Sequence, residues 1–251
     1  MKNEIEVSVI MPTYNASKYI EEAIESVYCQ KVNWELIIID DASDDDTEHI
    51  VQKFLEDERV VYIKNKENLG VAASRNLGIQ WAKGEYIAFL DADDRWTKGK
   101  LELQLELMKE KNAVLCSTAR VLMHETGELT GKIIPVKERV TYKALLYGNC
   151  ISMSSAMVRK KVALEFPMGH DHLHEDYIFW LQILAKYEVA YGINEPMLEY
   201  RVARESKSGN KLRSAAMTFG VYRYIGLNVF QSIYYFIGYA VNGVKKYIFS
   251  R

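Results

Sequence analysis

The chain has 251 residues, of which 49% are hydrophobic and 26% charged; this excludes a largely disordered protein and allows one large domain, or one domain plus an appendage. Its three cysteines form no CxxC pair, which argues against a disulfide framework and a zinc site and indicates a reducing compartment, and its N-terminal stretch lacks the pattern of a secretory signal. The net charge is −2, but residues 201–251 hold nine Lys or Arg and one acid, so a tail of +8 follows a body of −10 and predicts an anionic partner.

Strands and helices alternate over the first 111 residues. β-branched runs predict buried strands at residues 5–11, 35–39, 60–64 and 86–90. Apolar periodicity predicts helices at residues 15–30, 43–55, 69–82 and 98–111, the first of them capped by Ser17. The alternation predicts an α/β fold with a mostly parallel central sheet flanked by helices on both faces.

The pattern loosens after residue 115. A strand is expected at residues 113–124, helices at 141–147 and 174–187, and a polar loop at 201–209. We expect two units, a catalytic body over residues 1–210 and a basic, aromatic tail over residues 211–251.

Three polar clusters follow predicted strands at the point where each strand ends. They are Pro12-Thr13-Tyr14-Asn15, Asp40-Asp41 and Asp91-Ala-Asp93. In parallel α/β sheets ligands bind beyond the carboxyl ends of the strands, so this coincidence predicts a binding site.

Asp91 and Asp93 form a DxD pair directly after the strand YIAFL. Carboxylates crowded at a strand end suit Mg²⁺ or Mn²⁺ shared with substrate phosphates, and such a metal would neutralise charge on a diphosphate leaving group. The alternative is a solvated turn in which Asp94 or Thr97 caps the next helix. For the pair alone we favour the turn; the two neighbouring clusters favour the metal.

Two further residues point to a nucleotide ligand. A carboxylate at Asp41 could accept the ring N–H of uracil, although Ser43 or Asp44 in the same segment could simply cap a helix. Arg75 follows a turn of small residues, from which it could reach a phosphate, although an arginine on the surface is the default.

Glu175 and Asp176 precede an apolar helix. Inverting sugar transfer needs a carboxylate that takes the proton of the acceptor hydroxyl, and Asp176 is the candidate base, with Glu175 orienting it or contacting the sugar. The alternative is capping by acids in a first helical turn. The nearby His170, Asp171, His172 and His174 leave a zinc site open, although their spacing matches no common pattern.

Arg201 begins a basic stretch with Arg204 and Lys207. A basic loop here could close over a diphosphate, and the equal alternative is that it only begins the tail.

The tail contains a mostly apolar stretch at residues 225–241, too short and too interrupted for a spanning helix. On a helix its polar residues gather on one side and its apolar residues on the other. The polar side holds Asn228, Gln231, Gly238, Asn242 and Lys245, and the apolar side Ile225, Val229, Phe230, Ile233, Phe236, Ile237 and Val244. We expect helices that lie in an anionic membrane interface; the alternative is packing against the catalytic domain or a second subunit.

Taken together, these segments resemble glycosyltransferase family 2, whose members have the GT-A fold. The resemblance covers roughly residues 5–205 and rests on SVIMPTYNASKYIEEAIESVYCQ, ELIIIDDASDDDT, NLGVAASRNLGI, YIAFLDADD and HEDYIFWLQIL, in the family's order. It differs at Arg204 and Glu205, where relatives often place a histidine.

The resemblance implies a role for each matching residue. Pro12 and Tyr14 line the nucleobase pocket, Asp41 binds uracil, and Arg75 lies near the donor. Asp91 and Asp93 bind Mn²⁺ or Mg²⁺, with Asp93 the direct ligand. Asp176 is the base of a single displacement with inversion.

With the basic tail, the resemblance predicts transfer from a UDP-sugar donor to a lipid-linked glycan acceptor at the cytoplasmic face of the bacterial inner membrane, in cell-surface polysaccharide synthesis. Two alternatives are a nucleotidyltransferase, although MPTYNAS is no glycine-rich phosphate loop, and a non-enzymatic nucleotide-binding membrane scaffold. Nucleic acid is not an expected partner, because the aromatic residues of the tail are embedded in an aliphatic stretch. The donor sugar and the oligomeric state stay open.

Overall fold

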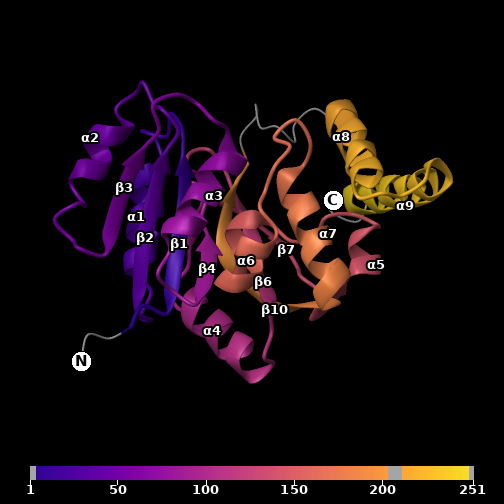
Figure 1. Ribbon diagram of the computed structural model, residues 1–251, viewed down its shortest axis with the longest axis horizontal. Coiled ribbons are helices and arrows are strands. Elements are labelled where there is room, and N and C mark those ends of the chain that lie inside the picture. The colour runs from indigo at the N-terminus through magenta and orange to yellow at the C-terminus, as the bar shows by residue number, and fades with distance from the viewer. Residues whose placement is uncertain (1–3, 203–210, 249–251) are drawn as a thin grey trace.

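A computed structural model describes residues 4–202 and 211–248 as one ten-stranded mixed sheet with helices on both faces (Figure 1). The strand order is β3-β2-β1-β4-β9-β6-β10-β5, with β7 paired to β6 and β8 to β10. The strands are β1 Val7–Thr13, β2 Trp34–Asp40, β3 Val60–Lys64, β4 Tyr86–Phe89, β5 Arg95–Trp96, β6 Leu115–Met123, β7 Leu129–Ile134, β8 Arg139–Thr141, β9 Ala156–Arg159 and β10 Val189–Arg201.

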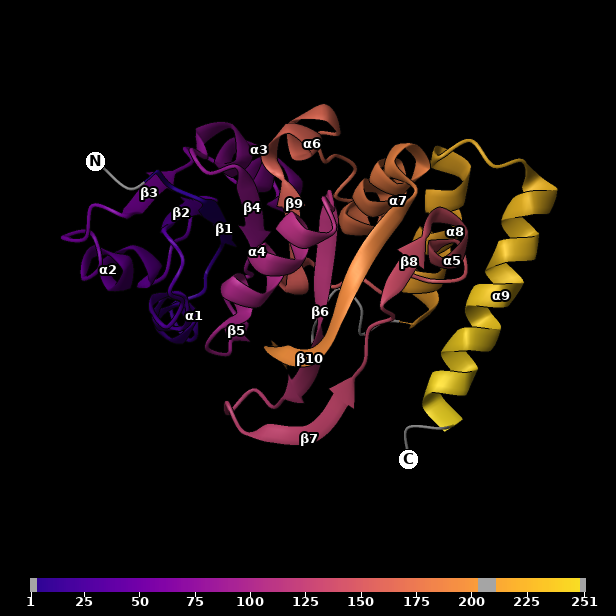
Figure 2. The ribbon, with the colours of Figure 1, turned by 90° about the horizontal axis from the view of Figure 1, so that it is seen from below.

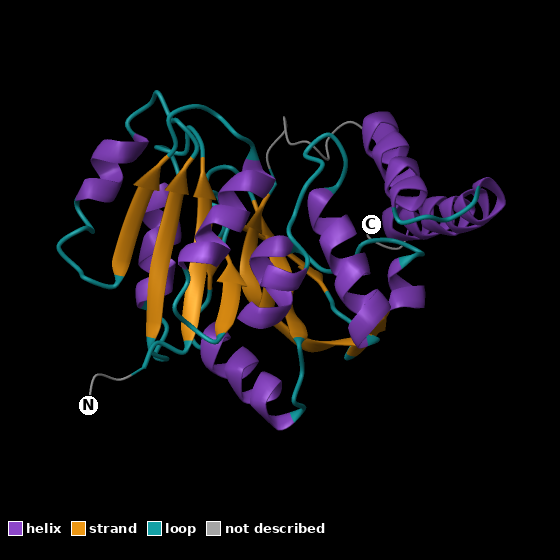
Figure 3. Cartoon of the chain, viewed as in Figure 1, coloured by secondary structure: helices purple, strands orange, loops and turns teal. Residues whose placement is uncertain are grey.

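Helices lie in the connections between the strands, and two more follow β10 (Figure 3). They are α1 Ile20–Tyr28, α2 Thr47–Gln52, α3 Val71–Trp81, α4 Lys100–Glu110, α5 Tyr142–Leu145, α6 Lys160–Glu165, α7 Glu175–Tyr187, α8 Lys211–Tyr224 and α9 Val229–Ile248.

The first four strands in spatial order, β3-β2-β1-β4, are all parallel. Every residue of β1 and β2 is buried, because side chains alternate between two covered faces. Ile10 joins the core under α3 and α7, whereas Val9 and Met11 join the core under α1 and α4. The expected α/β fold with a central sheet and flanking helices is therefore confirmed.

The second half of the sheet is completed by antiparallel strands. β9 lies antiparallel between β4 and β6, and β10 returns parallel to β6. The sequence did not reveal β10, a strand of 13 residues, because Pro196 and its polar neighbours interrupt the apolar pattern. The register with β6 shifts on both sides of Pro196, which is where a sheet tolerates a proline.

Several predicted helix starts lie too early. Helix α1 begins at Ile20, not residue 15, because Asn15 adopts a left-handed φ of 48°. Ser17 does not cap it; its N–H donates to Asp45 instead. Neither Ser43 nor Asp44 caps α2, and α4 has Gly99 at its N-cap position with no side-chain cap.

The C-terminal helices α8 and α9 lie at one end of the molecule, beside α5 and α7 (Figure 2). Val221 and Tyr222 of α8 are fully buried, and the Tyr222 hydroxyl donates to the Leu146 carbonyl at 2.7 Å. The helices therefore pack on the body. None of the helices described is long and apolar enough to cross a membrane.

Among the described residues of helix α9, only part of the polar side faces the protein, since Gln231, like Asn228 just before the helix, is exposed, and much of the apolar side is turned outward. Gly238 packs on the Tyr147 ring, and Asn242 donates to the Tyr147 carbonyl at 3.0 Å. We call the exposed row the outer face of α9; it consists of Val229, Phe230, Ile233, Tyr234, Ile237 and Val241. Ile225 and Phe236, which the periodicity grouped with this row, pack against the core instead.

Candidate active site

The three polar clusters meet at one edge of the sheet, because β2, β1 and β4 are parallel neighbours. Pro12 is buried within β1, and the Tyr14 side chain beyond the strand is 53% exposed. The Asp41 N–H donates to the Thr13 carbonyl at 2.8 Å, which joins two of the clusters. An exposed aromatic ring beside a buried carboxylate could hold a flat base.

Asp41 holds the loop that leads into α3. Its buried carboxylate accepts the Asn65 amide at 2.7 Å and the N–H groups of Leu69 and Gly70 at 2.9 and 2.8 Å. On the other side Asp171 accepts the N–H of Ala72. Gly70 has a φ of 91°, and a Cβ there would lie 1.9 Å from Asp171 Oδ2, so only glycine fits between the two carboxylates.

Arg75 joins two clusters that lie 84 residues apart in the chain. Its guanidinium donates to Asp91 Oδ1 at 2.7 Å and to Glu175 Oε1 at 2.9 Å, and the side chain is only 4% exposed. Burial alone would lower the pKa of Arg75, but the charges of Asp91 and Glu175 raise it overall, so the residue stays cationic. Its Nε has no hydrogen-bond partner among the described residues.

Asp93 and Asp94 lie in a crowded acidic turn. Burial, then the charge of Asp91, raises the pKa of Asp93 to about 6. Burial and both neighbouring carboxylates raise the pKa of Asp94 well above its usual range. Mutual repulsion of this kind is relieved by a cation.

Arg201 is bound by the protein itself. Its Nε donates to the Asp93 carbonyl at 2.7 Å, its N–H to Asp94 Oδ1 at 2.9 Å, and its Nη2 to Glu22 at 3.0 Å. The side chain is 1% exposed. Arg201 thus fixes the turn that carries the DxD pair, while Arg204, Glu205 and Lys207 of the predicted phosphate loop lie outside the described residues.

The DxD turn suits a hard cation that shares its ligands with substrate. Within residues 4–202 and 211–248, no group of three or more His, Cys, Asp or Glu could hold a metal ion. The carboxylates of Asp91 and Asp93 still fit Mg²⁺ or Mn²⁺. These ions commonly bind one or two carboxylates and complete their coordination shell with phosphates and water. The zinc alternative gains no such support: the His170 ring contacts the tilted Tyr224 ring, and His174 forms a hydrogen bond with Ser214.

Asp176 lies in the first turn of α7, next to Glu175 and thus beside the Arg75 network. Its Oδ2 accepts the Asn149 amide at 2.9 Å, and its Oδ1 accepts the Tyr177 N–H at 2.7 Å. Burial first, then the charge of Glu175, raises its pKa to about 6, against the opposing effects of His174 and Arg75. A carboxylate that is ionised at neutral pH, yet more basic than usual, can accept a proton.

Comparison with known proteins identifies the class of enzyme. The profile of the family described as "Glycosyl transferase family 2" matches residues 8–165. The chain is 40% identical to the teichuronic acid biosynthesis glycosyltransferase TuaG of Bacillus subtilis, over 96% of each chain. It is 35% identical to the UDP-Glc:alpha-D-GlcNAc-diphosphoundecaprenol beta-1,3-glucosyltransferase WfgD of Escherichia coli, over 97% of this chain and 95% of WfgD.

The chain belongs to glycosyltransferase family 2. It is therefore a glycosyltransferase, rather than a nucleotidyltransferase or a non-enzymatic scaffold. The fold agrees: the crystal structure of S. aureus TarS in complex with UDP-GlcNAc superposes with a TM-score of 0.74 at 18% identity, over 94% of this chain and 72% of TarS. Both share the GT-A fold.

The sequence missed some residues of this family 2 site. Asn149, which holds Asp176, follows a glycine in a loop without a recognisable pattern. Asp171 was considered only as a zinc ligand, whereas it packs on Gly70 and accepts from α3. Asp94 was considered as a cap, whereas it accepts the Arg201 N–H. Only the three-dimensional fold brings these partners together.

Proposed function

We propose that this family 2 glycosyltransferase moves one sugar from a UDP-sugar to a lipid-linked glycan, with inversion, in bacterial cell-surface polysaccharide synthesis. The observation that carries this proposal is the Arg75 bridge, which ties Asp91 at the strand ends to Glu175, the neighbour of Asp176. The names of the relatives support it: WfgD uses UDP-Glc and a diphosphoundecaprenol acceptor, and TarS was crystallised with UDP-GlcNAc.

The donor would bind at the carboxyl ends of β1, β2 and β4. The Tyr14 ring, beside buried Pro12, offers a surface for the base. Asp41 already accepts three N–H groups, and a carboxylate has about four acceptor positions, so one remains for the ring N–H of uracil. Asp41 would then couple base recognition to the loop at the start of α3.

Asp93, with Asp91, would hold Mn²⁺ or Mg²⁺. When bound, that ion supplies positive charge to the diphosphate as it leaves. Arg201 acts here as a positioning residue, because it holds the backbone of Asp93 and the carboxylate of Asp94. Arg75 neutralises Asp91 from the protein side and leaves its second oxygen free of the guanidinium.

The reaction is a single displacement in which Asp176 is the base. The acceptor hydroxyl oxygen forms a bond to the anomeric carbon, the bond from that carbon to the diphosphate oxygen breaks, and the hydroxyl proton passes to Asp176. Attack from the side opposite the diphosphate turns an α-linked donor into a β-linked product. Asn149 holds the carboxylate in place, and Glu175 is itself fixed by Arg75.

Residues 211–251 would associate with the cytoplasmic face of the inner membrane. The outer face of α9 presents Phe230 at 84% exposure and Ile237 at 59%, in a segment whose net charge is positive. A helix with an apolar outward face and flanking basic residues binds anionic lipid surfaces. Residues 1–210 form the catalytic body on which this segment packs.

The test is UDP release by the purified protein with Mn²⁺ and a panel of UDP-sugars, with and without a bacterial lipid extract. We expect turnover of one donor, a rate increase with the lipid extract, and loss of turnover in Asp176→Asn. If no donor is bound or turned over in the presence of metal, the proposed function is wrong.

A further inference from the structure

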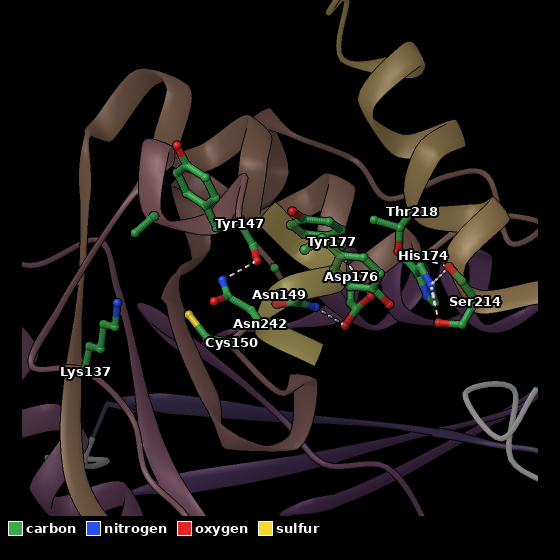
Figure 4. A pocket seen from close by; sticks show the side chains of 13 residues that line it. Lys137, Tyr147, Asn149, Cys150, His174, Asp176, Tyr177, Ser214, Thr218 and Asn242 are labelled. Carbon is green, nitrogen blue, oxygen red and sulfur yellow. Dashed lines mark hydrogen bonds between the residues drawn. The ribbon is translucent and has the colours of Figure 1, made fainter. Parts of the chain in front are cut away.

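A cavity of about 880 Å³ opens beside Asp176 (Figure 4). Its walls come from the loop after β7, the end of α5, the start of α7, and the C-terminal helices α8 and α9. This volume lies within the range of small-molecule sites. We call it the α9 cavity. None of the strand-end residues Pro12, Asp41, Asp91 or Asp93 lines it, so it is distinct from the proposed donor site.

Asp176 lies between the α9 cavity and the proposed donor site. Its own carboxylate lines the α9 cavity, whereas Glu175, one residue earlier, points to Arg75 and through it to Asp91. In an inverting displacement the nucleophile arrives opposite the leaving group. Asp91 and Asp93, which would hold the metal and the leaving group, lie on one side of the base, and the open cavity lies on the other. The acceptor would therefore approach the base from the cavity.

The lining matches a sugar. The rings of Tyr147 and Tyr239 provide apolar surface, and the amides of Asn149 and Asn242 provide polar groups near them. Pockets of this composition orient a ligand with a few polar contacts on an apolar wall. Asn149 already holds Asp176, so a hydroxyl that reaches this carboxylate lies beside the amide.

Lys137 supplies a positive charge at the other wall of the cavity. It is the one Lys or Arg among the described residues that line the cavity. It is exposed, and its ammonium group makes no hydrogen bond or ion pair within residues 4–202 and 211–248. Figure 4 shows its side chain directed toward the space between the walls. An uncommitted ammonium group at the wall of a cavity suits a phosphate or diphosphate.

We infer that the α9 cavity binds the glycosyl-diphosphate end of a lipid-linked acceptor, with the sugar at Asp176 and the diphosphate at Lys137. The inference rests on the proposed function and extends it to a site. Helix α9 forms one wall of the cavity with Tyr239 and Asn242 and turns its outer face away from the body, so the lipid chain would leave beside the surface proposed to meet the membrane.

The test compares Lys137→Ala, Lys137→Arg and the matched control Lys132→Ala, which removes an exposed lysine on β7 outside the cavity. With an N-acetylglucosaminyl diphosphate bearing a short alkyl chain, we expect Lys137→Ala to raise the acceptor KM about tenfold, the worth of one charge-assisted hydrogen bond. Lys137→Arg should restore most of the affinity, Lys132→Ala should behave as wild type, and UDP affinity should stay unchanged throughout.

Two inhibitors identify the source of the diphosphate. Farnesyl diphosphate should compete with the acceptor but not with the UDP-sugar, and inorganic diphosphate should compete far more weakly. If farnesyl diphosphate and inorganic diphosphate compete equally well, the site binds free diphosphate, and the inference that it binds a lipid-linked acceptor is wrong. UDP release with an unchanged acceptor KM in Lys137→Ala would overturn this inference alone, whereas a wild-type protein that turns over no UDP-sugar would remove the proposed function as well.

Discussion

The donor edge and the α9 cavity are built in opposite ways. At the donor edge, which comprises Asp41, Arg75, Asp91 and Asp93, Asp91 and Asp93 share one acidic turn, the buried Arg75 pairs with Asp91, and backbone N–H groups hold Asp41. In the α9 cavity the walls are aromatic rings and amides on helices and loops, with one uncommitted ammonium group. An unpaired buried charge is costly, so the charged groups at the donor edge need partners within the protein. A sugar site depends instead on the shape of an apolar pocket with a few polar groups.

The largest effect should come from the residue at which the two regions meet. Asp176→Asn keeps the shape and one of the two hydrogen bonds that the carboxylate accepts from Asn149 and from the Tyr177 N–H, but it cannot take a proton, so kcat should fall about 10³-fold. UDP affinity, measured by calorimetry, should stay at the wild-type value. The control Asp57→Asn changes a surface carboxylate paired with Arg59 and should retain full activity. A kcat within tenfold of wild type in Asp176→Asn would show that the base is another group.

Breaking the charge balance of the donor edge should cost stability. Arg75→Met leaves Asp91 and Glu175 without their buried partner, and we expect the free energy of unfolding in urea to fall by about 3–5 kcal/mol.

Lys53→Met is the control for Arg75→Met, because Lys53 forms an ion pair with Glu21 in which both side chains are about half exposed. Its cost should be below about 1 kcal/mol. Equal costs for the two variants would mean that the Arg75 bridge does not hold the site together.

The outer face of α9 should decide membrane association. Phe230→Glu replaces the most exposed apolar side chain of that row, and binding to anionic vesicles should weaken about 10- to 100-fold, the worth of burying one phenylalanine. Gln52→Glu makes the same change of charge on α2, far from α9, and should bind as wild type in a cosedimentation assay. If both variants bind alike, the outer face does not meet the membrane.

The smallest effect concerns pH. The pKa of Asp176 is raised to about 6, so its carboxylate forms only as the pH rises through that value. The rate should therefore be half-maximal near pH 6, reach a plateau above about pH 7 and be about tenfold lower at pH 5. Asp93 titrates in the same range, and UDP affinity measured at each pH separates its contribution. A rate that is flat from pH 5 to 8 would contradict the assignment.

Much of the fold and part of the site follow from the sequence alone. The buried strands β1 to β4 are continuous apolar runs that end in polar clusters, and their parallel order brings Asp41 and Asp91 to one edge. Asp176 and Arg75 could be named as candidates from their motifs. Their connection through Glu175 could not, because it joins helices α3 and α7 on one face of the sheet between residues 100 positions apart in the chain.

The remaining features depend on tertiary contacts that leave no local signal. Periodicity separated the two sides of α9 but could not say which one faces the body; Tyr147, nearly a hundred residues earlier, decides that through Gly238 and Asn242. Likewise, the basic setting of Arg201 suggested a phosphate ligand, whereas the fold surrounds its guanidinium with the Asp93 carbonyl and Glu22.

The separation of donor edge and α9 cavity is tested most directly by two-substrate kinetics on Gly238→Leu. A Cβ at Gly238 would lie 2.5 Å from the Tyr147 ring, so the variant displaces α9 and reshapes the cavity wall, while Ala240→Leu on the exposed side of the same helix does not. We predict an acceptor KM raised about tenfold in Gly238→Leu, with the KM of the UDP-sugar unchanged, and wild-type values in Ala240→Leu. An unchanged acceptor KM, or an equal rise in the KM of the UDP-sugar, would contradict the assignment of the acceptor to this cavity.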